Sequence, residues 1–324
     1  MTDKDRREAE YLRNRLAKND RNLRRWARRE AVFAYRLYDG DIPEIPLAID
    51  RYLDSQDELS LIMALYERPY EKEEAAETEW LALMAGAASE ALGVPPERIF
   101  TKTRRRMRGD AQYECLGSAK AERVVLEGGL SFIVNLSDYL DSGLFLDHRP
   151  LRARVREESR DKRVLNLFCY TGSFSAYAAS GGAASVNSVD LSKTYLAWAE
   201  RNLRANGFSG PAYPTVRAEV RDFLAEARRK GKTWDLIVLD PPTFSNSKAS
   251  ELDFDVNRDW PALVGQALDV LAPEGVLYFS TNSRRLKWQP ELVPADVEEL
   301  GESCVPPDFR DKKIHRAWRI TREK

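Results

Sequence analysis

The sequence predicts an α/β fold in its second half and a separate α+β domain before it. From about residue 150 onward, short apolar runs alternate with helical patterns, which is typical of a parallel sheet covered by helices on both faces. The earlier residues indicate a long basic helix, short strands, a second helix and a hairpin. We therefore expect an N-terminal α+β domain over residues 1–136, and over 137–324 a mostly parallel sheet of seven strands.

Local patterns justify each element of the first domain. Leucines and a tryptophan recur at helical spacing near the N-terminus, and Gly93 and Pro95 close a second helix. Gly128-Gly129 can take positive φ, which a tight hairpin turn requires. The expected order is a helix over 4–29, strands over 34–38, 46–53 and 59–66, a helix over 75–92, a strand over 99–106 and a hairpin over 124–134.

The second domain has its clearest helix at residues 192–205. This helix begins at a capping serine and ends at Asn206-Gly207, a favourable C-terminal pair. The expected strands are 163–168, 185–190, 215–218, 234–239 and 276–281, with later ones near 302–305 and 315–321.

Composition limits the class of protein. At 324 residues and 37.0 kDa the chain can form two domains with ordinary cores. No apolar run approaches the roughly 20 residues that span a bilayer, and the charged N-terminus has no signal-peptide pattern. Three scattered cysteines (Cys115, Cys169 and Cys304) fit a reducing compartment, and only two histidines make a zinc site improbable. We expect a cytoplasmic protein with no membrane segment and no metal.

Basic residues are unevenly distributed although the net charge is −1. Residues 1–36 hold twelve Lys/Arg against six Asp/Glu, and a second basic cluster spans 102–108. Local basic faces can bind phosphates because screening confines the field to about 10 Å. For the first segment, a solvated helix face with i,i+4 ion pairs explains the pattern equally well. For the second we favour phosphate binding, by Arg104, Arg105, Arg106 and Arg108.

Polar and small residues follow the first two strands of the expected sheet. Ligands of such sheets bind outside the carboxyl ends of the strands. The turn containing Gly172 and Ser173 lets backbone N–H groups approach a ligand, and the missing G-x-G-x-x-G pattern favours a ligand without phosphates. Asp190 closes the second strand, where a carboxylate can accept hydrogen bonds from ribose hydroxyls; capping the next helix is the alternative.

Acidic residues also follow the third and fourth strands. Either Glu219 or Asp222 can accept a hydrogen bond from an adenine amino group, and the other then serves as a cap or surface acid; we assign the adenine to Glu219. Asp240 precedes two prolines and Phe244, a set that can hold a flat base, with stacking worth about 1–3 kcal/mol. A plain proline-rich loop is the alternative for this segment alone. Together the four strand ends predict an S-adenosylmethionine site beside a nucleobase.

Several motifs resemble one family of enzymes. Residues 166–172, 240–247 and 143–149, with Asp308-Phe309 and His315 near the C-terminus, are similar to the Rossmann-like class I S-adenosylmethionine-dependent RNA methyltransferases. The likeness is strongest to the RlmK type, the C-terminal half of bifunctional RlmKL, which methylates guanine N7 in 23S rRNA. The resemblance implies that cofactor and that substrate. The fused guanine-N2 methyltransferase and THUMP portions have no counterpart in this sequence, so RNA recruitment is expected to use the N-terminal half.

Motifs and strand ends together define the candidate residues. His148 and His315 are interpreted as structural, although His148 could line the site. The cofactor set is Asp147, Arg149, Phe168, Tyr170, Thr171, Gly172, Ser173, Asp190, Leu191, Glu219, Asp222 and Asp240. The catalytic set is Asp240, Pro241, Pro242, Phe244 and Asn246.

The chemistry of the base narrows the reaction. Cytosine C5 needs a nucleophilic cysteine for activation, and residues 279–283 contain none. Guanine N7 carries a lone pair and needs only in-line positioning. Two alternatives stay open: methylation of another base position or a protein amide, and a non-catalytic RNA-binding module.

Overall fold

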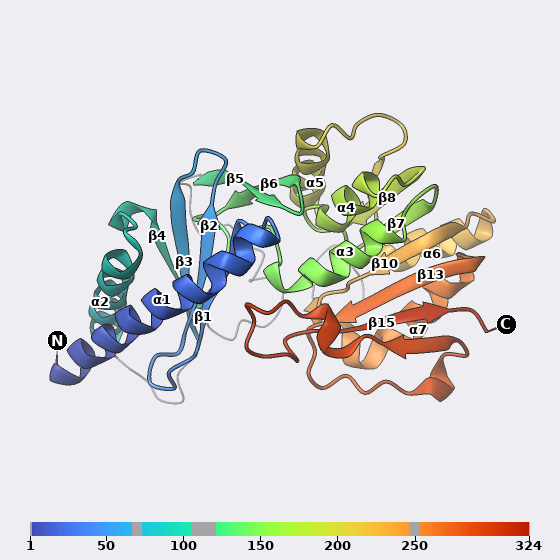
Figure 1. Ribbon diagram of the computed structural model, residues 1–324. Coiled ribbons are helices and arrows are strands. Elements are labelled where there is room, and N and C mark those ends of the chain that lie inside the picture. The colour runs from blue at the N-terminus through green and yellow to red at the C-terminus, as the bar shows by residue number, and fades with distance from the viewer. Residues whose placement is uncertain (1, 67–72, 105–120, 246–252, 324) are drawn as a thin grey trace. The chain divides into compact units, whose positions relative to one another are not determined.

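The computed structural model describes residues 2–66, 73–104, 121–245 and 253–323, and side chains at 103 and 104 are not described (Figure 1). Within it the chain forms two compact units. The first comprises Met1–Ser142 and Asp308–Arg310, and the second Gly143–Pro307 and Asp311–Lys324. A short segment near the C-terminus therefore belongs to the first unit, which the sequence did not suggest.

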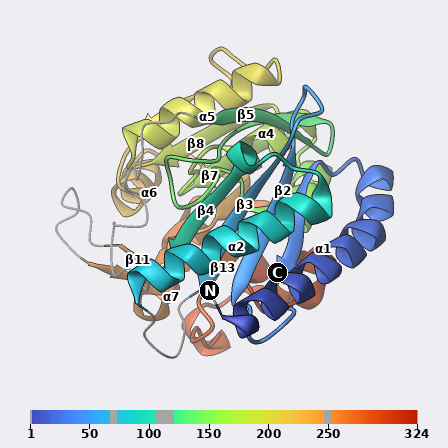
Figure 2. The same cartoon turned by 90° about the vertical axis from the view of Figure 1, so that its left-hand side faces the viewer.

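Two helices cover one face of a four-stranded sheet in the first unit (Figure 2). One apolar stripe of helix α1, containing Leu12 and Leu16, is fully buried in this core. Thr2 caps the helix in a capping box with Asp5, which satisfies N–H groups of the first turn. The elements are α1 (Asp3–Arg29), β1 (Ala34–Asp39), β2 (Leu47–Leu53), β3 (Leu59–Tyr66), α2 (Glu74–Leu92), η1 (Pro96–Arg98) and β4 (Ile99–Arg104).

The strands of this sheet follow the order β1-β2-β3-β4, antiparallel except for the parallel pair β3–β4. A separate hairpin joins β5 (Glu122–Glu127) to β6 (Leu130–Asn135), and both glycines of its turn have positive φ. The helices, strands and hairpin predicted for this domain are confirmed. The strand expected to reach residue 106 is described as far as Arg104.

The second unit contains a seven-stranded sheet in the order β14-β15-β13-β10-β7-β8-β9. Strands β13, β10, β7, β8 and β9 run parallel, and β15 is antiparallel to both of its neighbours, β13 and β14. This confirms the predicted sheet of seven mostly parallel strands. Its strands are β7 (Arg163–Leu167), β8 (Ser185–Asp190), β9 (Thr215–Arg217), β10 (Trp234–Leu239), β13 (Leu271–Thr281), β14 (Asp296–Glu299) and β15 (Arg316–Thr321).

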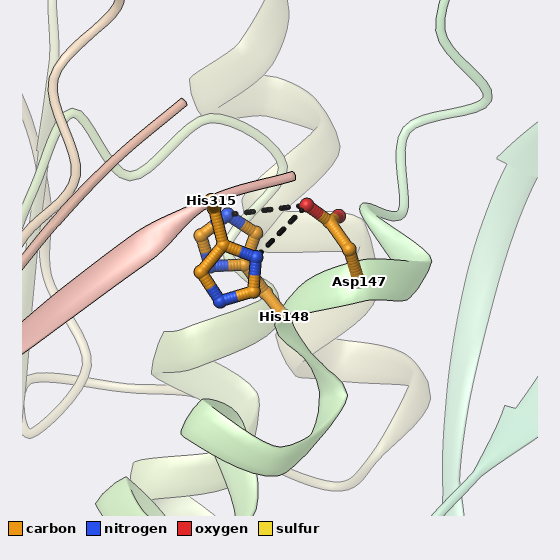
Figure 3. Close-up of side chains that lie close together, drawn as sticks. All are labelled: Asp147, His148 and His315. Carbon is orange, nitrogen blue, oxygen red and sulfur yellow. Dashed lines mark hydrogen bonds and ion pairs between the residues drawn. The ribbon is translucent and has the colours of Figure 1, made fainter. Parts of the chain in front are cut away.

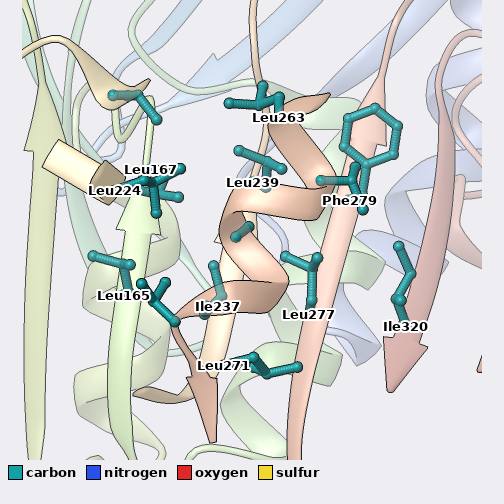
Figure 4. Close-up of a cluster of buried hydrophobic side chains, with 14 of the residues drawn as sticks. Leu165, Leu167, Leu224, Ile237, Leu239, Leu263, Leu271, Leu277, Phe279 and Ile320 are labelled. Atoms are coloured by element: carbon teal, nitrogen blue, oxygen red, sulfur yellow. The ribbon is translucent and has the colours of Figure 1, made fainter. Parts of the chain in front are cut away.

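Alternate residues of these strands feed two cores on opposite faces of the sheet. Leu165 and Leu167 pack in the cluster that also holds side chains of α6 and α7 (Figure 4). Val164 packs with α3 and α4 on the other face. Burial on both faces explains why the strands read as continuous apolar runs. The helices are α3 (Arg149–Glu157), α4 (Ser173–Ser180), α5 (Lys193–Ala205), α6 (Val220–Arg229) and α7 (Val256–Asp269), with short η3 (Leu146–His148), η4 (Pro290–Leu292) and η5 (Gly301–Cys304).

One predicted strand was wrong. Residues near 302–305 form the 3-10 helix η5, and the strand is β14 instead. The sequence of β14, Asp-Val-Glu-Glu, resembles a turn because three of its four residues are acidic. It pairs only with β15, and charged side chains are common on such edge strands because they discourage further pairing.

Two smaller features complete the description. Phe168, expected to end a strand, lies just beyond β7 with φ of 55°. A short pair, β11 (Phe244–Ser245) and β12 (Phe254–Asp255), flanks residues outside the described set. Among the described residues, no helix combines the length and apolar character needed to span a bilayer.

Candidate functional site

The loop after β7 is fixed by hydrogen bonds from neighbouring segments. The Thr171 hydroxyl donates to the Gly143 carbonyl at 2.5 Å, and the Asn202 side chain donates to the Thr171 carbonyl at 2.8 Å. The Gly172 N–H bonds back to the Cys169 carbonyl at 2.8 Å, which closes the turn. The loop is therefore rigidly placed before any ligand binds.

Gly172 is required by packing as well as by its backbone conformation. Its φ of 75° lies in the left-handed region, where a Cβ is unfavourable. A Cβ at this position would also come within 2.8 Å of the Ala199 Cβ on α5. The glycine therefore lets α5 approach the loop. Its own N–H is used within the turn, and the exposure of other backbone N–H groups to a ligand stays a prediction.

Asp190 at the end of β8 joins two loops. One carboxylate oxygen accepts the Tyr170 N–H at 2.9 Å, and the other accepts the Ser192 N–H at 2.8 Å. The cap of α5 is Ser192 itself, whose hydroxyl accepts the Tyr195 N–H. Burial raises the pKa of Asp190 above its usual value, opposed by these N–H donors. Each oxygen keeps a further lone pair that can accept a hydrogen bond from a ribose hydroxyl. The ribose contact itself stays a prediction.

Aromatic rings gather around the same loop, and the sequence analysis missed most of them. The Tyr170 ring lies 5.1 Å from Phe145 and 4.5 Å from Tyr195, centroid to centroid. Phe168 packs against Phe254 at 6.1 Å. The carboxylate, the rings and the nearby backbone N–H groups together suit a nucleoside, because its sugar offers hydroxyl donors and its base a flat apolar face.

The two acids after β9 have different environments. The Glu219 carboxylate caps α6 by accepting the N–H groups of Arg221 and Asp222 at 2.7 and 3.1 Å, and it pairs with the Arg221 side chain. The Asp222 side chain is exposed. Glu219 is therefore the cap of α6. A hydrogen bond from adenine to either acid stays a prediction.

Asp240 follows β10 at the same edge of the sheet as the β7 loop, since β10 and β7 pair in parallel. Its Oδ1 accepts the Ser280 hydroxyl at 2.5 Å. Its Oδ2 lies 3.9 Å from Nε2 of His148 and has no hydrogen-bond donor within the described residues, and 19% of the side chain is exposed. Pro241 is buried, and Pro242 and Phe244 are half-buried.

Two histidines stack on each other next to Asp147 (Figure 3). The rings of His148 and His315 lie 4.2 Å apart and nearly parallel, at 11°. Nδ1 of His315 lies 3.1 Å from the Asp147 carboxylate, and Nε2 of His148 lies 3.9 Å from the same oxygen. Burial lowers the pKa of His148. The histidines are buried as interpreted, but His148 also faces Asp240, which its motif alone did not establish.

Asp147, His148 and His315 are close enough together to be considered as ligands of a metal ion. Imidazole lone pairs lie in the plane of each ring, however, and two stacked, nearly parallel rings with centroids 4.2 Å apart do not direct their lone pairs at one point. Binding would require one ring to rotate out of the stack. The stacked rings instead form a buried wall beside the Asp240 carboxylate, which His148 faces at 3.9 Å.

A series of contacts within the second unit connects Asp190 to Asp240. Asp190 binds the Tyr170 backbone, the Tyr170 ring contacts Phe145, and Phe145 lies 6.2 Å from His148, which faces Asp240. Gly172, Asp190 and Asp240 therefore lie at one edge of the sheet, as predicted.

The remaining candidates differ in how well they are placed. Asp147 is buried in η3, Arg149 is buried at the start of α3, and Ser173 opens α4. The Leu191 carbonyl accepts a hydrogen bond from the Arg217 side chain. The positions outside the described residues or side chains are Arg104, Arg105, Arg106, Arg108 and Asn246.

Comparison with known proteins identifies the class. The model of the S-adenosylmethionine-dependent methyltransferase family matches residues 52–293. The chain belongs to this family, which confirms the predicted fold class and cofactor.

The relatives narrow the class further. The chain is 46% identical over 309 residues to ribosomal RNA large subunit methyltransferase K of Neisseria meningitidis, covering 95% of this chain and 86% of that protein. It is 45% identical over 318 residues to methyltransferase K/L of Magnetococcus marinus, covering 97% of this chain but 43% of that protein. The chain thus spans less than half of the K/L relative. The resemblance to this group is confirmed.

Solved structures agree with the fold. SMU.776, crystallised with S-adenosylhomocysteine (SAH), is 26% identical with a TM-score of 0.75, and the match covers 96% of this chain and 81% of that one. A methyltransferase from Agrobacterium tumefaciens shares the fold with a TM-score of 0.61 at 20% identity, covering 86% and 88% of the two chains.

Proposed function

We propose that this chain transfers a methyl group from S-adenosylmethionine to N7 of a guanine in 23S rRNA. The observation that carries the proposal is the continuous set of contacts from Asp190 to Asp240 at one edge of the sheet. It places residues suited to a nucleoside at one end and, at the other, an Asp240 oxygen that faces His148 at 3.9 Å and accepts no hydrogen bond from the described residues. The names of the relatives supply the substrate class.

The residues present fit this cofactor. When bound, S-adenosylmethionine supplies a methyl group on a positively charged sulfur. We assign the methionine end to the loop and first turn at Tyr170, Thr171, Gly172 and Ser173, the ribose to Asp190, and the adenine amino group to Glu219 or Asp222. Asp240, Pro242 and Phe244 seat the guanine, and Asn246 reads its edge.

The reaction demands little proton chemistry from the protein. Guanine N7 attacks with its lone pair, the electrons of the broken sulfur–carbon bond return to sulfur, and no proton leaves the base. A thiol nucleophile is not needed and is not favoured. Burial raises the pKa of Cys169 well above its usual value and that of Cys304 to about 11, so both thiols stay protonated at neutral pH. Cys115 lies outside the described residues.

The proposed partner is 23S rRNA, contacted by Arg104, Arg105, Arg106 and Arg108 and by the N-terminal helix. A cytoplasmic location is part of the same proposal, since ribosomal RNA is found there and the scattered cysteines suit a reducing compartment.

The decisive experiment compares 23S rRNA from cells with and without the gene by nucleoside mass spectrometry. We expect one N7-methylguanine to disappear and to return when purified protein and S-adenosylmethionine are added to that rRNA. Unchanged N7-methylguanine rejects the proposal. Loss of another methylated base, or methylation of a protein, selects the second hypothesis, and cofactor binding without transfer selects the non-catalytic one.

A further inference from the structure

One face of α1 carries a continuous row of exposed side chains, here called the α1 stripe. Its members are spaced alternately four and three residues apart, which places them on one side of a helix. All seven are exposed, five are cationic, and the row covers about 31 Å at 1.5 Å per residue. They are Arg7, Tyr11, Asn14, Lys18, Arg21, Arg25 and Arg28.

Ion pairing separates this stripe from the rest of the helix. Five of the six cations off the stripe each face a carboxylate, and the sixth, Arg6, faces none among the described residues. The pairs are Lys4 with Glu8, Arg13 with Glu90, Arg15 with Asp41, Arg24 with Asp20, and Arg29 with Glu30. The five cations of the stripe have no carboxylate within ion-pair distance among the described residues. Two of these five pairs are i,i+4 pairs within the helix, so that explanation accounts for part of the other faces and for none of the stripe.

The opposite face of α1 is already used. Leu12 and Leu16 are fully buried in the core of the first unit. The helix therefore has no free apolar face to insert into a bilayer, which distinguishes it from a membrane-surface helix. A partner of this helix can contact only the exposed α1 stripe. Because the charges of the stripe are positive, that partner must be anionic.

The side chains of the stripe favour an RNA strand over other anions. Four of its five cations are arginines, whose planar guanidinium matches phosphate oxygens in bidentate geometry. Arg21, Arg25 and Arg28 line a surface hollow together with Asp20 and Arg24. Tyr11, at 55% exposure, is one of two large hydrophobic side chains recorded as exposed in the described part of the chain, and a base can stack on its ring.

We propose that the α1 stripe is a track for single-stranded RNA, with Arg21, Arg25 and Arg28 on successive phosphates and Tyr11 stacked on an unpaired base. The inference rests on the proposed function, because it names the part of the molecule that holds the ribosomal substrate. It also gives α1 a defined RNA-facing side, separate from the 104–108 cluster.

The test measures binding of a labelled 30-nucleotide single-stranded RNA of mixed sequence at several salt concentrations. In the triple variant Arg21→Gln, Arg25→Gln, Arg28→Gln, the slope of log affinity against log salt should fall by about 2, since each single-strand phosphate contact contributes roughly 0.7. The control changes the paired cations Lys4, Arg13 and Arg29 to Gln, which removes the same charge. Its slope should stay near that of the unchanged protein.

Tyr11 gives an independent readout. Tyr11→Ala should weaken binding about 5- to 150-fold without changing the salt slope, because stacking involves no counterion release. Tyr11→Phe should bind like the unchanged protein, since it keeps the ring. Circular dichroism verifies that each variant retains its helices.

The outcomes separate this inference from the proposed function. If the unchanged protein methylates rRNA but the stripe and control variants show equal slopes, the track is rejected and the function stands. If the stripe governs the slope while no methyl transfer is found, the function fails and the track stands. Equal weakening by the control, or stripe-dependent binding to phosphatidylserine vesicles rather than to RNA, also rejects the track.

Discussion

Asp190 and Asp240 each follow a parallel strand at the same edge of one sheet, yet their carboxylates are used differently. Both oxygens of Asp190 accept backbone N–H groups, so this side chain holds the Tyr170 and Ser192 loops in place. Asp240 has one oxygen bound to Ser280 and the other directed toward His148 at 3.9 Å. The position in the fold brings an acid to the edge, and the surrounding donors decide how many of its oxygens accept hydrogen bonds within the protein.

The strongest test of the comparison is Asp240→Asn. The amide can still accept the Ser280 hydroxyl, so the fold should persist, but the negative charge that we propose faces the base is lost. We expect methyl transfer to 23S rRNA to fall by about 100-fold or more, measured with radiolabelled S-adenosylmethionine. Ser280→Ala keeps the carboxylate and should cost about tenfold or less. An Asp240→Asn protein with nearly unchanged activity would remove Asp240 from the base site.

The next largest effect is expected for Asp190→Ala. It removes acceptors for two backbone N–H groups and for the proposed ribose contact, so the affinity for S-adenosylmethionine should fall about 10- to 150-fold in calorimetry. The free energy of unfolding should also fall, by about 2–3 kcal/mol. Asp190→Asn, which keeps one carbonyl oxygen, should lie between the two proteins. Cofactor affinity unchanged in Asp190→Ala would leave Asp190 with a structural role alone.

Gly172→Ala tests the loop that Asp190 holds. The added Cβ meets Ala199 at 2.8 Å and forces a left-handed residue, so we expect a loss of about 3 kcal/mol in the free energy of unfolding from urea titrations. Gly207 provides the control, because its φ is 80° but nothing lies within 4 Å of a Cβ there. Gly207→Ala should cost only about 1 kcal/mol. Equal losses at both positions would mean that the contact with α5 is unimportant.

The smallest effect concerns His148 beside Asp240. Because burial lowers the pKa of His148 below 6.5, the unfolded chain binds a proton there before the folded chain does. Stability from this group is complete above pH 6.5 and declines as the pH falls, by at most about 1.4 kcal/mol per pH unit. Urea titrations from pH 8 to 5.5 should show this decline reduced in His148→Gln. Parallel pH profiles for the two proteins would contradict the burial argument.

The sequence predicted the sheet and the position of its acids because these depend on local patterns. Apolar runs identify buried strands, and parallel strands bring their carboxyl ends to one edge of the sheet. Asp190 and Asp240 could therefore be placed at the same edge without a structure. The strand β14 could not be found this way, since its acidic residues carry no signal of burial.

The partners of these acids depend on contacts between distant segments. Asp147 and His315 meet across 168 residues, and Phe145 reaches Tyr170 from before the first strand of its sheet. No periodicity in one chain encodes such meetings, because side-chain packing decides them. The ion pairs that distinguish the two sides of α1 were likewise beyond the sequence, which showed only an excess of basic residues.

The segment Asp308–Arg310 has a consequence for biosynthesis. The buried N–H of Arg36 donates to the Asp308 carboxylate at 2.9 Å, and the Arg36 guanidinium lies 4.5 Å above the Phe309 ring. These partners are separated by 272 residues of chain. At a translation rate of about 5–20 residues per second, the N-terminal sheet waits on the order of 10 to 60 seconds for residues that complete its hydrogen bonding. The first unit is therefore synthesised first but completes its contacts only after most of the second unit has been made.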